Sequence, residues 1–209
     1  ALLTKDGTVT FDGNLKLDSK NTTLTSGAIN GLILSLDSRI MSPGLKAELI
    51  NNGTITASGR RSVGMALMAP RVGQGILNLI NNGTINMEYV YEPVNYTSNL
   101  GTGINIFLSK SEDTGQALVK TGNINLTGKE LTGVSIARFQ DNYSSTAVNS
   151  LLTIDGSGGL INVAGRENIG LYIKMYNGQI SSNNGFENMK NMNILVDGMR
   201  NTGVYINVT

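Results

Sequence analysis

Carboxylates are the side chains best able to do chemistry in this chain of 209 residues, because it contains neither His nor Cys. Without these two residue types, Ser-His-Asp and Cys-His nucleophiles, His-zinc sites, disulfides and iron–sulfur clusters are excluded. The 15 Asp and Glu residues are spread thinly, and the one adjacent pair, Glu112 and Asp113, lies in a polar stretch. Polysaccharide hydrolases and lyases need clustered carboxylates, or a calcium site with a basic residue. The sequence therefore predicts no catalytic residue, no metal site and no cofactor.

Charged residues recur at two neighbouring positions of a repeated segment. The first position holds Arg60, Lys129 and Arg166, and the second holds Arg61, Glu130, Glu167 and Arg200. Opposite charges at neighbouring positions indicate solvated contacts that neutralise one another and contribute little to stability. A basic patch that binds sulfated or sialylated glycans is the alternative interpretation.

Glycine and asparagine recur in register along the chain, which contains 26 glycines. Residues 49–56 recur almost unchanged at 79–86, with the shared string Leu-Ile-Asn-Asn-Gly-Thr-Ile. Four segments fit Ile-x3-Gly-x4-Gly-apolar-x-apolar without a gap, and they begin at Ile55, Ile124, Ile161 and Ile194. The closing glycines stand at positions 31, 64, 103, 133, 170 and 203. A constant motif at a variable spacing is typical of a coil of short strands joined by loops of free length.

The residues after each closing glycine alternate as in a β-strand with one face in a core. The inward positions of this strand are Leu32 and Leu34, Met65 and Leu67, Ile104 and Ile106, Val134 and Ile136, Leu171 and Ile173, and Val204 and Ile206. The outward position between them reads Ile33, Ala66, Asn105, Ser135, Tyr172 and Tyr205. A second strand places Ile55, Ile85, Ile124, Ile161 and Ile194 inward, and a third strand before it places Leu49 and Leu79 inward.

These columns predict an all-β fold, a right-handed parallel β-helix (β-solenoid) of about six coils with three short strands per coil. Equivalent strands stack about 4.8 Å apart, and glycine at the corners allows positive φ or close backbone approach. Asn51 with Asn81, and Asn52 with Asn82, are expected to form side-chain ladders. A β-sandwich is the competing interpretation, but sandwiches do not repeat one motif in register. We expect residues 1–209 to form a single β-helix segment.

One coil is longer than the others. The distance from Gly83 to the closing Gly103 is 20 residues, whereas Gly122 and Gly133 are 11 residues apart. The extra residues lie within 87–100, an inserted loop that contains Tyr89, Tyr91, Glu92 and Tyr96. Insertions in solenoids often form binding loops, and tyrosine suits the recognition of proteins and sugars. Binding by these four residues is one hypothesis, and an edge hairpin that covers the flank of the coil is the other.

Tyr172 and Tyr205 occupy the same outward position in adjacent coils. They are therefore expected to stack about 4.8 Å apart. An exposed aromatic pair can bind the face of a sugar, and it can also simply stabilise the contact between coils.

The strings Asn-Asn-Gly-Thr-Ile at 51–55 and 81–85, followed by Gly-(Arg/Lys)-x3-Gly-apolar-x-apolar, resemble the passenger region of large autotransporter (type V secretion) adhesins of Gram-negative bacteria. The resemblance covers about residues 7–209. It implies a non-enzymatic adhesive or stalk segment at the bacterial cell surface, outside the outer membrane, with a host cell-surface protein or glycan as partner. It also implies a segment excised from a longer passenger and exported through its own C-terminal outer-membrane β-barrel, which is absent from this chain.

Other functions stay open or are disfavoured on composition. The net charge is +1 and the basic residues are scattered, so no nucleic-acid partner is expected. A β-helical polysaccharide-degrading enzyme and a toxin-type passenger that acts on membranes are the alternatives. We expect a monomer whose terminal coils fray or pair with another copy in crystals, because solenoid ends leave strand edges unpaired.

Overall fold

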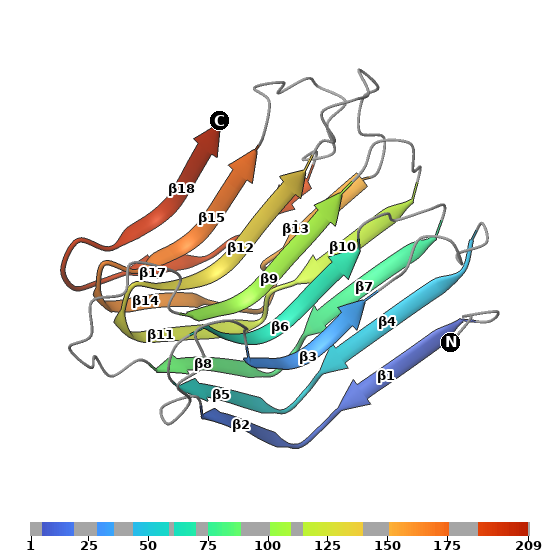
Figure 1. Cartoon of the computed structure of the whole chain (residues 1–209), viewed down its shortest axis with the longest axis horizontal. Helices are drawn as coiled ribbons and strands as arrows, with labels where there is room; N and C mark the ends of the chain where they lie inside the picture. Colours follow the sequence, from blue (N-terminus) through green and yellow to red (C-terminus); the bar gives the residue numbers. More distant parts are fainter. Residues whose placement is uncertain are drawn as a thin grey trace.

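The computed structural model describes residues 6–18, 29–35, 44–58, 61–69, 75–88, 101–109, 115–139, 151–175 and 188–208. Within these residues the chain is all-β and contains no helix. Strands that are far apart in the sequence lie side by side. The chain winds as a right-handed coil through three sheets, each made of parallel strands (Figure 1).

Each coil contributes one strand to each of the three sheets. The first sheet contains β1 (Gly7–Phe11), β4 (Lys46–Asn51), β7 (Ile76–Asn81), β10 (Gln116–Lys120), β13 (Leu151–Asp155) and β16 (Asn188–Lys190). The second contains β2 (Asn14–Asp18), β5 (Thr54–Ser58), β8 (Thr84–Glu88), β11 (Asn123–Lys129), β14 (Ile161–Arg166) and β17 (Ile194–Val196). The third contains β3 (Ile29–Ser35), β6 (Ser62–Ala69), β9 (Gly101–Ser109), β12 (Leu131–Phe139), β15 (Ile169–Met175) and β18 (Thr202–Val208). This arrangement confirms the predicted parallel β-solenoid with three strands per coil.

The core consists of columns of aliphatic side chains that run along the axis of the stack. In the second sheet Ile55, Ile85, Ile124 and Ile161 pair in register and are buried, and Ile194 extends the column as a partly buried residue. Leu49 and Leu79 lie inward on the first sheet, as predicted. In the middle coils of the third sheet, the residues on either side of the predicted outward position are likewise buried. The apolar-x-apolar pattern therefore correctly identifies the face of these strands that lies in the core.

Burial departs from the predicted columns in the third sheet. Ala66 is buried although it occupies the outward column, because its single methyl group lies between the longer Ile33 and Asn105 of the flanking strands. Val204 and Ile206 are exposed although their register places them on the inward side. They belong to β18, which is the last strand of the third sheet in the described residues and pairs with β15 on one side only. An inward residue is buried only when strands lie on both sides of it, and the alternating pattern does not report this.

The closing glycines form a column in which the backbones of successive coils approach closely. A Cβ atom added to Gly133 would lie 2.5 Å from the carbonyl oxygen of Gly170 and 2.9 Å from Cγ2 of Ile161. Real Cβ atoms do not make contacts this short with a carbonyl oxygen. The column therefore requires glycine because there is no space for a side chain. Gly165 and Gly198, at the preceding corner, also have positive φ values of 96° and 92°, which glycine adopts without steric cost.

Asparagine ladders connect the coils where the first sheet turns into the second. The Nδ2 atom of the buried Asn51 donates to Oδ1 of Asn81 at 2.7 Å, and Nδ2 of Asn81 donates to the carbonyl of Thr121 at 2.7 Å. Beside this buried ladder, Nδ2 of the exposed Asn82 donates to Oδ1 of Asn52 at 3.0 Å. Both predicted ladders are therefore confirmed.

The two ladders differ in burial, and this difference predicts different effects of substitution. We expect Asn81→Ala to lower the free energy of unfolding by about 2–3 kcal/mol, because the buried amide of Asn51 and the carbonyl of Thr121 each lose a partner. Asn82→Ala removes an exposed ladder and is expected to cost less than about 0.5 kcal/mol. Urea denaturation of both variants gives the comparison. Equal losses at the two positions would show that burial does not set the strength of the ladders.

Candidate functional site

The strongest described candidate for a binding site is the aromatic pair on the outer face of the third sheet. Tyr172 of β15 and Tyr205 of β18 are register partners, and they point outward because Leu171 and Ile173 on either side of Tyr172 are directed into the core. The two ring centroids are 5.6 Å apart and the ring planes differ by 8°. Tyr205 is 46% exposed, and Tyr172 is partly exposed. The predicted stacking is therefore confirmed.

This pair offers both apolar and polar contacts to a ligand. Each phenol ring presents aromatic surface, and its hydroxyl group can donate and accept hydrogen bonds. Parallel rings fixed on neighbouring strands lose little conformational freedom when a ligand binds, because tyrosine has only two side-chain torsions. The arrangement can therefore take up the apolar face of a sugar ring or an exposed side chain of a protein.

The other predicted binding residues, Tyr89, Tyr91, Glu92 and Tyr96, lie outside the described residues. Of the predicted insertion 87–100, only Met87 and Glu88 are described, and both belong to β8. Met87 is buried in the core in register with Ala57 and Leu126, so the start of this range is regular strand. Glu112, Asp113 and Arg60 also lie outside the described residues.

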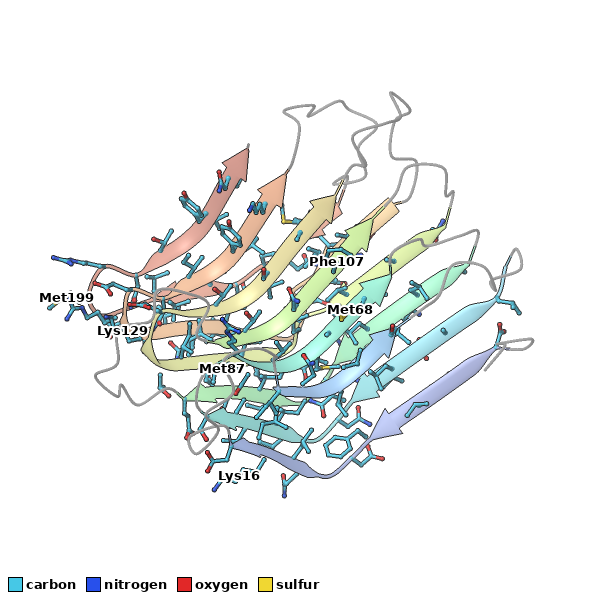
Figure 2. The ribbon with its side chains drawn as sticks, in the orientation of Figure 1. Lys16, Met68, Met87, Phe107, Lys129 and Met199 are labelled. Atoms are coloured by element: carbon cyan, nitrogen blue, oxygen red, sulfur yellow. The ribbon has the colours of Figure 1, made fainter. Side chains whose placement is uncertain are left out.

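Charged side chains gather at the corner between the second and third sheets (Figure 2 labels Lys129 there). Nζ of Lys129 lies 2.9 Å from Oε1 of Glu130 and 3.5 Å from Oε2 of Glu167 in the next coil. Oε1 of Glu167 accepts hydrogen bonds from Nε of Arg166 at 3.2 Å and from Nη1 of Arg200 at 3.3 Å. One carboxylate therefore contacts three cationic side chains from three coils.

Oppositely charged side chains contact one another at this corner, where Lys129, Arg166 and Arg200 outnumber Glu130 and Glu167. Desolvation raises the pKa of Glu167, but the nearby charges of Arg166 and Lys129 outweigh it and hold that pKa below its ordinary value. The hydrogen bond with Glu130 raises the pKa of Lys129. Both groups are therefore charged at neutral pH, and each lies beside at least one opposite charge. The corner fits the interpretation of mutually neutralising contacts, each of which contributes little because it is exposed to solvent.

The backbone of this corner has a feature that the sequence pattern did not reveal. The four residues at the second charged position have left-handed backbone conformations, with φ of 53° at Arg61, 59° at Glu130, 58° at Glu167 and 56° at Arg200. This conformation normally favours Gly, Asn or Asp, so the charged residue types gave no indication of it. The shared spacing from the preceding glycine was the available signal.

A buried asparagine at the same corner was also missed. Asn168 is fully buried, its Oδ1 accepts from the backbone N–H of Leu131 at 2.8 Å, and its Nδ2 donates to the carbonyl of Gly128 at 3.2 Å. Its own N–H donates to Oδ1 of Asn201 in the next coil at 2.8 Å. Both asparagines stand two residues before a closing glycine, which is the signal that could have identified this further asparagine contact between coils.

Neither a metal centre nor a membrane-spanning helix is found in the part of the chain that the structure describes. No three Asp or Glu side chains there gather in a way that could hold a metal ion. None of these residues belongs to a helix long and apolar enough to cross a membrane. The class that the structure defines is thus a parallel β-solenoid with an outward tyrosine pair. No family model, curated protein or solved structure was found to match this chain.

Proposed function

We propose that this chain is a non-enzymatic, surface-displayed adhesive or stalk segment of an autotransporter passenger, and that it binds a host cell-surface protein or glycan. The observation that carries the proposal is the stacked tyrosine pair, held on the outer face of a parallel β-solenoid. The carboxylates at the charged corner are engaged with cations, which disfavours the alternative of a polysaccharide-degrading enzyme there.

The solenoid suits display because its coils add length in one direction. Each coil adds about 4.8 Å to the stack and packs only against its neighbours, so the outward side chains remain accessible along the length. A chain without cysteine also contains no disulfide that would have to pass through a narrow export barrel. The proposed location is the bacterial cell surface, and the proposed export route is type V secretion through an outer-membrane β-barrel.

Ligand binding is tested with the purified chain on a glycan array and on host cells. We expect the double variant Tyr172→Ala/Tyr205→Ala to bind at least about tenfold more weakly than the wild type, because the aromatic surface is lost. Ile33→Ala is the matched control, since Ile33 is 44% exposed in the same outward column at the other end of the sheet. Unchanged binding by the double variant, or no binding by the wild-type chain, would contradict the proposal.

A further inference from the structure

The stacked tyrosine pair uses only one face of the Tyr172 ring. The rings of Tyr172 and Tyr205 are parallel to within 8° and their centroids are 5.6 Å apart, so one face of Tyr172 is turned toward Tyr205. Its opposite face is turned toward β12, where Ser135 is the register partner of Tyr172. The serine side chain is too short to cover a phenol ring on the next strand. Ser135 therefore leaves this second face of Tyr172 uncovered.

Uncharged polar groups follow Tyr172 along the same outward column. Strands β9, β12 and β15 are consecutive in the third sheet (Figure 1), and their register places Asn105 beside Ser135 and Ser135 beside Tyr172. We call these three residues the Tyr172 row. Each of its strands has a neighbour on both sides, and all three residues are partly exposed. The outward exposure of the row therefore does not depend on the ends of the stack.

The polar groups of the row are available to a ligand. Within the described ranges, neither the hydroxyl group of Ser135 nor the side-chain amide of Asn105 makes a hydrogen bond to another residue. A hydroxyl group and an amide each offer both donors and acceptors, as the hydroxyl groups of a sugar do. The uncovered face of Tyr172 offers aromatic surface to the C–H face of a sugar ring. The row thus combines the apolar and polar contacts that a sugar needs.

The length of the row fits a single sugar ring. Neighbouring strands are about 4.8 Å apart, so about 9.6 Å separates the strands of Tyr172 and Asn105. A pyranose ring in van der Waals contact with Tyr172 at about 4 Å leaves about 6 Å on the side of Asn105. One hydroxyl group and a hydrogen bond of about 3 Å span that distance. A row of three side chains is also far smaller than the roughly 800 Å² per partner of a stable protein interface, which favours a sugar over a protein.

The charge of the surroundings favours an uncharged sugar. The Tyr172 row has no charged side chain, and β9, β12 and β15 contain no Asp or Glu. Lys174, two residues beyond Tyr172 on the same face, already takes part in another interaction. A sulfate or carboxylate group over the row would lose water without gaining an ionic partner from the row, whereas a neutral sugar has no such penalty.

We propose that the Tyr172 row binds one neutral hexopyranose unit of a glycan. The C–H face of the sugar packs on the uncovered face of Tyr172, and its hydroxyl groups form hydrogen bonds with Ser135 and Asn105. This inference rests on the proposed adhesive function and narrows its ligand to a neutral glycan. Tyr205 is a positioning residue in this arrangement, because it stacks on the other face of Tyr172 and holds that ring in place.

The full chain is tested on an array of neutral and acidic glycans, and the dissociation constant is then measured for the neutral glycan that binds most tightly. Ser135→Leu fills the space in front of Tyr172 and keeps both rings, so we expect at least about tenfold weaker binding. Ser35→Leu is the matched control, because Ser35 is exposed on the outer face of β3, and it should bind like the wild type. Asn105→Ala removes one hydrogen bond and should weaken binding about three- to tenfold.

Two further variants test the roles of the neighbouring residues. Tyr205→Phe keeps the stacked ring and should bind like the wild type, whereas Tyr205→Ala should bind more weakly because Tyr172 loses its support. Lys174→Ala should leave the affinity for the neutral glycan unchanged. Salt should not change that affinity either, because screening acts on charges and the row has none.

The outcomes separate this inference from the proposed function. Wild-type affinity of Ser135→Leu for the neutral glycan would overturn the inference and leave the adhesive function standing. Binding of the wild-type chain to acidic glycans alone, or to a host protein alone, would do the same, as would weaker binding by Lys174→Ala. A wild-type chain that binds neither glycans nor host cells would contradict both.

Discussion

Ile124→Asn is expected to lower the free energy of unfolding by about 3–5 kcal/mol. Ile124 is fully buried, and it stands between Ile85 and Ile161 in the inward column of the second sheet. Its Cγ2 atom would lie only 2.9 Å from a Cβ atom added to Gly103, so this part of the core is tightly packed. Asparagine removes the apolar contacts and buries an amide among aliphatic side chains, and both changes destabilise the folded state.

Urea denaturation followed by circular dichroism measures this change. Ile33→Asn is the control, because the same substitution is made at a position that is 44% exposed on the outer face. There we expect a change below about 0.5 kcal/mol. A loss below about 1 kcal/mol at Ile124, or equal losses at the two positions, would contradict the proposed register.

The fold could be predicted from the sequence because identical residues recur at identical positions of the coil. Alternation with a period of two identifies the inner face of each strand, and the repeat then fixes which strands pair. The isoleucine column through Ile124 and the ladder from Asn51 to Asn81 both follow from this logic. A parallel stack in register brings equivalent positions together without further information.

Features that depend on neighbours could not be predicted in the same way. Ala66 is outward by pattern but is shielded by the side chains beside it, and Val204 is inward by pattern but lies on the last strand of its sheet. The left-handed backbone at Glu167 has no signature in its residue type. In each case the deciding factor is the three-dimensional surroundings, which the motif does not encode.

The candidate site likewise has features that the sequence predicts and features that it does not. The pairing of Tyr172 with Tyr205 follows from their shared position in adjacent coils, so the sequence was sufficient to predict it. The spacing of 5.6 Å between ring centroids also depends on the side-chain torsions, so it differs from the strand spacing of about 4.8 Å. The predicted binding residues between 89 and 96 lie outside the described residues, and their role stays a prediction.

Gly133→Ala is expected to lower the free energy of unfolding by about 2–4 kcal/mol, which is a large effect for one methyl group. The added Cβ atom would lie 2.5 Å from the backbone oxygen of Gly170, and backbone atoms cannot move aside as a flexible side chain can. It would also lie 2.9 Å from Cγ2 of Ile161, which is itself held in the buried isoleucine column. The strain therefore has to be relieved by separating two coils, which weakens the parallel pairing of β12 with β15.

The central claim, that the repeated motif encodes coils stacked in register with their closing glycines in contact, is tested most directly by comparing Gly133→Ala with Gly203→Ala. Both glycines occupy the same position of the motif, but an alanine at Gly203 meets only Cγ2 of Val196 at an ordinary distance of 3.4 Å. The measurement is the difference in free energy of unfolding between the two variants, made by urea denaturation at a concentration where the chain is monomeric. We predict that Gly133→Ala is less stable than Gly203→Ala by at least about 2 kcal/mol. Equal stability of the two variants would contradict the stacked arrangement.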